Sequence, residues 1–319
     1  MPSFATPFVT AHDAHPIRSR PAERDIGRFA ETSSVRWLRR VFAVLNRTAP
    51  SASARLAYAL LTRPPRVPER AWEAAIRAQA HASALPFGKG HLAVYEWGTG
   101  PAVLLVHGWG ARGTHFGKLV PALVASGHRV VAFDAPAHGR SSGRHTTLPD
   151  FAAAVAAVAA HAGEIQTLIA HSFGVAMALW AQAEWGLRVQ RQVLFSSLDH
   201  CQWVTEEFAR LVNLPSAVIE RGRQLMVERT SGRMAWDALS VGDWLRHSMA
   251  PTLLLHDADD AEVPIQHFFS LMKACGQRPL DLHVTEGLGH HRLLGDPGVI
   301  ARVMDFLRAP GCSPLSPQR

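Results

Sequence analysis

Nearly continuous apolar runs alternate with amphipathic stretches along most of the chain after His91. The apolar runs predict strands at 91–97, 101–106, 128–133, 165–170, 192–195, 252–256 and 280–284. Helical spacing predicts helices at 148–162, at 173–185, from about 265 onward and at 299–307. Buried strands that alternate with helices are typical of a mostly parallel sheet covered on both faces. We therefore predict an α/β fold with a doubly wound, mostly parallel sheet.

The stretch 197–249 interrupts this alternation. It has helical patterns and no convincing strand, and it carries several large aromatic residues: Trp203, Phe208, Trp236 and Trp244. We predict a helical insertion between two strands of the sheet. It is either a lid over an active site or an ordinary helical excursion.

The N-terminal part has helical spacing of a different kind. Val35, Leu38, Val41, Phe42 and Leu45 recur at helical intervals, and further helices are predicted at 51–61 and 68–82. Residues 1–80 carry 13 Arg, no Lys and 6 acidic residues. Such a basic amphipathic segment can lie on an anionic membrane surface, here through residues 34–61. Alternatively, its apolar face packs against the main domain.

These patterns predict the domain organisation. Residues 1–84 form a basic helical N-terminal extension, whose first 30 residues are expected to be poorly ordered or draped over the surface. Residues 85–196 and 250–309 form the core, 197–249 the insertion and 310–319 a tail. The sequence 98–100 (GTG) predicts a hairpin turn.

Composition narrows the class of protein. Hydrophobic residues make up 47% of the 319 and charged residues 18%, which suits a globular protein. Beyond residue 80 the charges balance, which argues against a nucleic-acid partner. The three cysteines are far apart, which argues against disulfides and against a cysteine zinc site. No leader or long apolar run is visible, so a cytoplasmic location is expected. The oligomeric state is not predicted.

The first chemical motif lies where a predicted strand meets a helix. Residues 165–174 read IQTLIAHSFG, which is close to the nucleophile elbow G-x-S-x-G. This tight turn exposes the Ser172 hydroxyl and requires small residues on both sides, because two backbones approach closely. Gly174 fits, and Ala170 replaces the usual glycine. Ser172 is therefore the candidate nucleophile.

Further segments follow in a defined order, and with them the chain resembles the α/β-hydrolase family over roughly residues 85–308. They are VLLVHGWG at 103–110, VVAFDAPAHGRSSG at 130–143, LLLHDADDAEVP at 253–264 and EGLGHHRLLGDP at 286–297. The resemblance implies a serine hydrolase with a helical lid. It also implies that the backbone N–H groups of Trp109 and Phe173 form an oxyanion hole. Ala137 and Asp257 stand where the family usually has glycine.

The resemblance also implies the other two members of a catalytic triad. Counting back from Val263-Pro264 places the acid at Asp260, and His290 after Gly289 takes the place of the general base. The order Ser, Asp, His is the one expected for this fold. Alternatives for the acid are Asp257, Asp259 and Asp199, and His291 is the alternative base.

The expected activity is cleavage of a carboxylic ester or thioester of a small to medium acyl substrate through an acyl-enzyme. An acyltransferase, a carbon–carbon bond hydrolase and a peptidase use the same triad, and a non-catalytic ligand receptor is an alternative of another class. The residues expected to line the pocket are His107, Gly108, Phe116 and Trp203, with Trp109 and Trp236 adding apolar surface. No metal and no organic cofactor is expected.

Several residues are expected to be structural. His107 and His138 should form hydrogen bonds that fix the loops at the strand ends, and the elbow should turn His171 away from Ser172. Cys201 and Cys275 should be small core residues.

Overall fold

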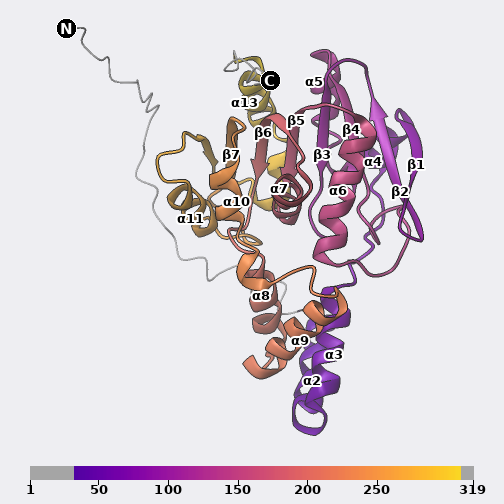
Figure 1. The fold of residues 1–319 in the computed structure, drawn as a ribbon, viewed down its shortest axis with the longest axis vertical. Helices are drawn as coiled ribbons and strands as arrows, with labels where there is room; N and C mark the ends of the chain where they lie inside the picture. Colours follow the sequence, from indigo (N-terminus) through magenta and orange to yellow (C-terminus); the bar gives the residue numbers. More distant parts are fainter. Residues whose placement is uncertain (1–31, 310–319) are drawn as a thin grey trace, which may run out of the picture.

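The computed structural model describes residues 32–309 and shows one twisted sheet flanked by helices (Figure 1). Within this part of the chain, eight strands follow the order β1-β2-β4-β3-β5-β6-β7-β8. The pairs β1/β2 and β2/β4 are antiparallel, and the other neighbours are parallel. The predicted α/β fold with a mostly parallel sheet is confirmed. The strands are β1 (His81–Phe87), β2 (Gly90–Trp97), β3 (Ala102–Val106), β4 (Arg129–Phe133), β5 (Ile165–His171), β6 (Val189–Phe195), β7 (Thr252–Asp257) and β8 (Asp281–Thr285).

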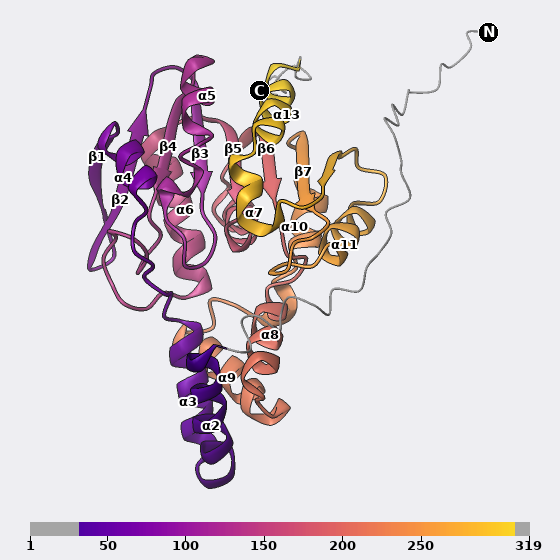
Figure 2. The same cartoon turned by 180° about the vertical axis from the view of Figure 1, so that it is seen from behind.

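Helices cover both faces of the sheet. Successive residues of β3 point in opposite directions: Leu104 packs in the core under α6 and α7, and Leu105 packs in the core under α5 and α13. Figure 1 shows α6 in front of the sheet, and Figure 2 shows α5 and α13 on the opposite face. The core helices are α4 (Ala71–Ala78), α5 (Val120–Ala125), α6 (Leu148–Ala162), α7 (Phe173–Trp185), α11 (Gln266–Cys275), α12 (Gly289–Arg292) and α13 (Pro297–Arg308), with the 3-10 turns η2 (Gly113–Phe116) and η4 (Leu293–Gly295).

Two local predictions were wrong. The helix predicted at 68–82 is shorter, because α4 ends at Ala78 and strand β1 begins at His81. This edge strand is only partly buried, so no apolar run marks it in the sequence. Residues 98–100 do not form a hairpin turn, because β4 lies between β2 and β3 in the sheet.

The insertion contains helices and no strand of the sheet. Its helices are α8 (Gln202–Val212), α9 (Ser216–Arg229) and α10 (Val241–His247), with the 3-10 turn η3 (Trp236–Ala238). α10 packs on α7 and α11, whereas α8 and α9 extend beyond the carboxyl ends of the strands (Figure 1).

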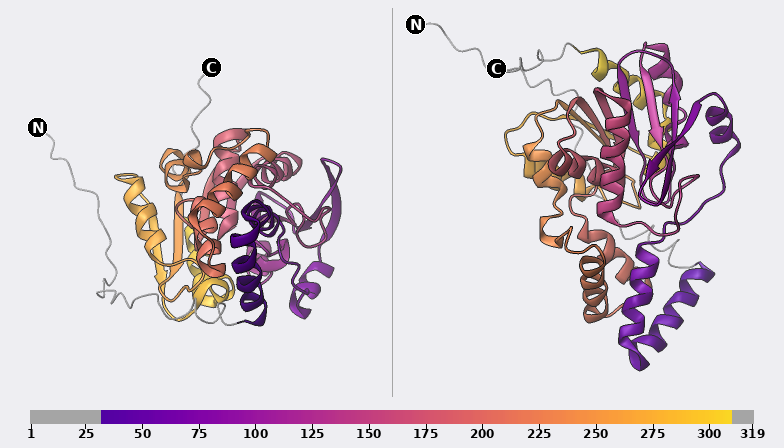
Figure 3. Two further views of the ribbon diagram at one scale, coloured as in Figure 1. Left: turned by 90° about the horizontal axis from the view of Figure 1, so that it is seen from below. Right: turned by 45° about the vertical axis from the view of Figure 1, so that its right-hand side comes forward.

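The N-terminal helices α2 (Ser33–Thr48) and α3 (Pro50–Leu61) pack against α8 and α9 rather than against the sheet (Figure 3). Phe42 is fully buried and meets Phe208 edge to face, with ring centroids 6.2 Å apart. α3 crosses α9 at Gly222, where an added Cβ would lie 3.8 Å from the carbonyl oxygen of Ala54. Helices α2 and α3 of the extension and α8 and α9 of the insertion therefore form one helical layer.

The opposite face of α2 is exposed. Trp37 and Val44 are each 61% exposed, and Arg36, Arg40 and Arg47 flank them. Membrane-surface contact through residues 34–61 stays a prediction. Among the described helices, none is long and apolar enough to cross a bilayer. The expectations for residues 1–30 and for the tail 310–319 lie outside the described residues.

Candidate active site

The sharp turn between β5 and α7 places Ser172 at the carboxyl end of the strand. Ser172 has φ 56° and ψ −129°, a backbone conformation that L-residues rarely adopt. A Cβ added at Gly174 would lie 2.3 Å from the carbonyl oxygen of His107, so only glycine fits there. Ala170 is fully buried in the strand and is tolerated where glycine is usual. The turn has the geometry expected for a nucleophile elbow.

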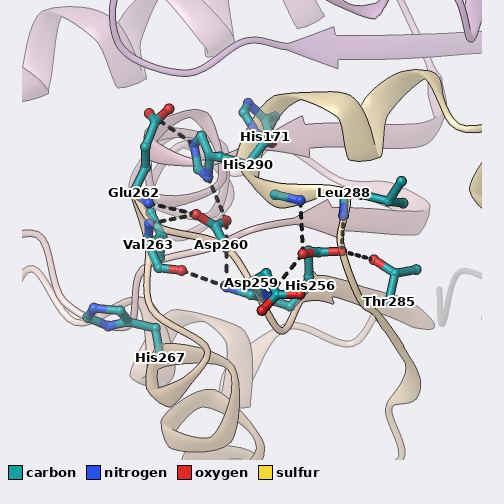
Figure 4. A network of polar contacts seen from close by, with 12 residues as sticks. His171, His256, Asp259, Asp260, Glu262, Val263, His267, Thr285, Leu288 and His290 are labelled. Carbon is teal, nitrogen blue, oxygen red and sulfur yellow. Dashed lines mark hydrogen bonds and ion pairs between the residues drawn. The ribbon is translucent and has the colours of Figure 1, made fainter. Parts of the chain in front are cut away.

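His290 and Asp260 form a buried hydrogen-bonded pair (Figure 4). The His290 Nδ1–H donates to Asp260 Oδ2 over 2.7 Å. The other carboxylate oxygen accepts the backbone N–H groups of Glu262 and Val263, both at 2.9 Å. Burial alone would raise the pKa of Asp260, but the hydrogen bond and the charge of His290 lower it below its usual value. The carboxylate therefore fixes the tautomer of His290 and leaves its Nε2 free to accept a proton.

The alternative acids are occupied elsewhere. Asp257 accepts the Thr285 hydroxyl at 2.7 Å and the N–H groups of Leu288 and Gly289 at 3.0 and 2.9 Å. It thereby fixes the segment that leads into His290. Asp259 accepts the N–H of Gly287 at 2.9 Å.

Asp199 lies apart from this network. It pairs with His267 at 2.7 Å. Of the acids weighed from the sequence, the structure therefore places Asp260 alone against Nδ1 of His290.

The alternative base, His291, has a different partner. Its Nε2 lies 2.8 Å from Glu262 Oε1, and its side chain is 46% exposed. The hydrogen bond that His291 donates to Glu262 raises the pKa of His291. Burial would raise the pKa of Glu262, but the His291 hydrogen bond lowers it on balance. Glu262 Oε2 also lies 3.9 Å from His290 Nε2. Glu262 was not predicted from the sequence, because no motif marks it and its contacts depend on how α12 packs against the loop after β7.

Ser172 and its neighbour His171, both in the elbow, differ in their contacts. The Ser172 hydroxyl is half-buried and forms no hydrogen bond with the described residues. Hydrogen bonds between nucleophile and base are often long without substrate and tighten when it binds. The His171 side chain points to α12, where its Nε2–H donates to the His290 carbonyl at 3.0 Å. Burial lowers the pKa of His171 well below its usual value.

The loop after β3 presents backbone amides beside the elbow. The N–H groups of Trp109 and Phe173 have no acceptor among the described residues. His107 fixes this loop as expected: its Nδ1–H donates to the Gly108 carbonyl at 2.7 Å, and its Nε2 accepts the Ala135 N–H at 2.9 Å. Burial lowers the pKa of His107 to about 3, so this histidine is neutral at physiological pH.

His138 packs beside the same loop. Its ring meets Trp109 edge to face with centroids 5.2 Å apart, and its Nδ1–H donates to the Pro136 carbonyl at 3.0 Å. Burial lowers its pKa to about 3 as well. The structural role expected for His138 is confirmed.

An apolar cavity of about 400 Å³ lies beside the elbow. Its walls come from the elbow and loops of the core (Trp109, Leu148, Phe173, Ala261 and Glu262), from α3 (Leu60 and Leu61) and mostly from the insertion (Cys201, Trp203, Val204, Thr205, Glu207, Phe208, Arg210, Leu211, Met226 and Trp236). The prediction for Trp203 agrees with this lining. Cys201, expected to be a core residue, is buried and also contacts the cavity.

The other residues predicted for the pocket do not line this cavity. Phe116 is fully buried in the core that packs under α5 and α13, away from the insertion. His107 and Gly108 do not line the cavity, because both are buried in the loop beneath Trp109. Gly108 instead faces the elbow, where an added Cβ would lie 3.0 Å from the Cβ of Ser172.

Comparison with known proteins agrees with this architecture. The sequence model of the alpha/beta hydrolase family matches residues 103–303, more than half of the chain. The chain belongs to the alpha/beta hydrolase family. It is 28% identical to a non-heme haloperoxidase of Rhodococcus erythropolis over 215 residues, which cover 53% of this chain and 78% of that protein.

Solved structures of other hydrolases share the fold. An esterase of Pyrococcus furiosus superposes with a TM-score of 0.59 at 17% identity and covers 77% of this chain and 96% of its own. A thermophilic esterase of Thermogutta terrifontis gives a TM-score of 0.53 at 22% identity, covering 72% and 98%. At these identities the likeness shows the alpha/beta hydrolase fold alone.

One departure from the family pattern has a structural explanation. Ala137 has φ 67°, in the region that favours the glycine usual there. The loop around it is fixed by Asp134, whose carboxylate accepts the N–H groups of Gly113 and Arg140 and the Tyr95 hydroxyl at 2.7–2.9 Å. These bonds hold the loop in which Ala137 adopts this φ.

Proposed function

We propose that this protein is a serine hydrolase that cleaves a carboxylic ester or thioester of a small to medium acyl substrate through an acyl-enzyme. The observation that carries the proposal is the buried Asp260–His290 pair, whose histidine ring lies 4.5 Å from that of His171, the residue before the strained Ser172. A hydrogen-bonded acid–base pair next to a serine hydroxyl is the arrangement that activates a serine.

The reaction follows from the positions of these groups. His290 Nε2 accepts the Ser172 proton while the oxygen attacks the acyl carbon, and Asp260 stabilises the imidazolium that forms. The N–H groups of Trp109 and Phe173 bind the tetrahedral oxyanion. Each such donor is worth about 3–4 kcal/mol in the transition state. His290 then protonates the leaving group, and water repeats the sequence on the acyl-enzyme.

The apolar cavity supports an acyl substrate. Its lining is largely aliphatic and aromatic, with Trp109 and Phe173 joining it to the elbow. Pockets of this kind bind apolar groups and use a small number of polar groups for orientation. We assign the insertion the role of a lid, because most of the cavity wall comes from α8, α9 and the turn that contains Trp236.

The same triad serves an acyltransferase, a carbon–carbon bond hydrolase or a peptidase, and the acceptor and the bond cleaved distinguish them. The likeness to a haloperoxidase adds hydrogen peroxide as an acceptor, with a peracid and the leaving group as products. A ligand receptor would bind in the cavity without turnover.

A panel of p-nitrophenyl esters and acyl thioesters of increasing chain length tests the proposal. We expect a rapid burst of leaving group equal to the enzyme concentration. The mass of the intact protein should rise by one acyl group, and digestion should place that group on the peptide that contains Ser172. Asp260→Asn should lower turnover about 10⁴-fold. Asp199→Asn is the matched control, because Asp199 pairs with His267 instead of His290.

Two results would decide against parts of this account. Equal losses of turnover in Asp199→Asn and Asp260→Asn would show that Asp260 is wrongly assigned as the catalytic acid. Tight binding of the acyl compounds without turnover or mass shift would favour the receptor.

A further inference from the structure

Three histidines converge beside the candidate nucleophile, and the proposed reaction uses only one of them. His171 precedes Ser172, and His290 and His291 are consecutive in α12. One ring nitrogen of each lies within 4.8 Å of the others. The ring centroids of His171 and His290 are 4.5 Å apart, and those of His290 and His291 are 5.0 Å apart. We name these three residues the triple-histidine cluster.

Each ring of the cluster already donates one N–H to a fixed acceptor. His171 donates to the His290 carbonyl at 3.0 Å, His290 to Asp260 at 2.7 Å, and His291 to Glu262 at 2.8 Å. In a neutral imidazole the opposite nitrogen then carries a lone pair. Histidines that bind metals in proteins are oriented in this way, by a carbonyl or carboxylate on the other nitrogen.

A second observation concerns His171 alone. Its Nδ1 is buried and has no hydrogen-bond partner among the described residues. This nitrogen faces Gly108, where an added Cβ would lie 3.5 Å away. Buried polar atoms are nearly always paired, so an unpaired one marks a place for water or an ion. A buried nitrogen with a free lone pair, on a ring that lies against two further histidines, suits a cation.

We propose that the triple-histidine cluster binds a first-row transition-metal ion such as Zn²⁺, and that binding reversibly switches the enzyme off. The inhibitory part rests on the proposed function. Imidazole nitrogen favours zinc, nickel and copper over magnesium and calcium. Because Zn–N bonds are about 2.0–2.1 Å, nitrogens around a tetrahedral zinc lie about 3.4 Å apart. The nitrogens of the cluster lie within 4.8 Å of one another and must move closer to reach that spacing, and the His291 ring, which is 46% exposed, is the one with the most freedom to turn. The exposed ring of His291 gives the ion a path from solvent.

The inhibition follows from the atom that is shared. The His290 Nε2 lone pair is the one that accepts the Ser172 proton in catalysis. When it is donated to a metal ion, the hydroxyl has no base and is not activated. No covalent bond forms or breaks, so removal of the metal by a chelator restores the enzyme.

Binding is measured first, apart from catalysis. Full-length Ser172→Ala protein, freed of metal, is titrated with Co²⁺ near pH 8, and the visible absorption of nitrogen-coordinated cobalt is recorded. We expect saturation at a single ion per chain, displacement by Zn²⁺ and no competition from Mg²⁺.

Variants test the ligands in the same assay. His291→Gln and His171→Gln should weaken Co²⁺ binding at least tenfold; the new amide at 171 can still donate to the His290 carbonyl. Glu262→Gln, which keeps an acceptor for His291, should weaken it about 10- to 100-fold. His161→Gln, on the exposed end of α6, is the control and should change nothing. Circular dichroism confirms that each variant is folded. Equal Co²⁺ spectra and affinities in His291→Gln and its parent would overturn the proposal.

Inhibition is then measured with wild-type enzyme and a fluorophosphonate probe, with and without Zn²⁺. We expect Zn²⁺ to slow labelling and EDTA to restore it, and His291→Gln to lose sensitivity by the same factor as its binding. If metal-free protein is labelled and Zn²⁺ does not change the labelling rate, the proposed inhibition by metal is wrong and the proposed function stands. If Co²⁺ binds as expected but the metal-free protein neither labels nor hydrolyses esters, the proposed function is wrong and the metal site stands.

Discussion

At the scale of single residues, the candidate site combines strain with close packing. Ser172 adopts a left-handed backbone conformation, and the neighbouring Gly174 leaves no room for a Cβ against the His107 carbonyl. Strain of this kind persists only where the surroundings enforce it, and it is common at catalytic positions. The position of the Ser172 hydroxyl at the elbow therefore costs the folded state some stability.

Relief of that strain should be measurable. Ser172→Gly, compared with Ser172→Ala, should raise the free energy of unfolding by about 1 kcal/mol, because glycine adopts this φ without a clash between Cβ and the backbone. Urea unfolding of the two variants gives the difference directly. Equal stabilities would show that the turn is not strained.

The residues of the site were predictable to different degrees. Ser172, Asp260 and His290 could be named because short motifs mark them in the sequence. Glu262 and the contact of His171 with His291 could not be predicted, because both depend on how α12 packs on the elbow. Phe116 was misplaced because an aromatic residue near a motif can point to either face of the sheet.

At the scale of elements, the core was easier to predict than the helical layer outside it. Buried parallel strands are apolar throughout and give a strong signal, whereas the edge strand β1 is half-exposed and gives none. The periodicity of α2 predicts an apolar face but not its partner. That partner is α8, which lies far away in the sequence, so only the tertiary structure shows that the extension supports the cavity wall.

The two faces of α2 should respond differently to substitution. Phe42→Ala should lower the free energy of unfolding by about 3–5 kcal/mol, because a fully buried ring between α2 and α8 is lost. Trp37→Ala, on the exposed face of the same helix, should change it by less than about 0.5 kcal/mol. Chemical denaturation of both variants tests the packing. Similar values for the two would mean that α2 does not dock on the insertion.

At the scale of the whole molecule, the sheet brings distant segments to one edge. The Trp109 loop follows β3, Ser172 follows β5, Asp260 follows β7 and His290 follows β8, so all lie at the carboxyl ends of parallel strands. The helical layer of extension and insertion then closes that edge and forms the cavity. The site depends on the fold as a whole.

Buried neutral histidines should make the stability of this fold sensitive to acid. Burial lowers the pKa of His107 and of His138 to about 3, well below the value near 6.5 of an unfolded chain. Between these values the unfolded chain binds protons that the native protein does not. The free energy of unfolding should therefore fall as the pH falls below about 6.5, by up to about 1.4 kcal/mol per pH unit for each histidine.

Urea unfolding at a series of pH values between about 7 and about 4 measures this slope. His138→Gln should reduce this slope, because one of the buried imidazoles is absent, and the exposed His161→Gln should leave it unchanged. A flat profile in this range, or equal slopes in the two variants, would contradict the assignment.

The most direct test of the central claim, that Asp260 and His290 activate Ser172, is covalent labelling by a fluorescent fluorophosphonate. This reagent reports an activated serine without knowledge of the substrate. We predict labelling of the metal-free wild-type protein, none in Ser172→Ala, and rates reduced by orders of magnitude in His290→Ala and Asp260→Asn. Labelling that persists in Ser172→Ala, or a folded wild-type protein that is never labelled, would contradict the account.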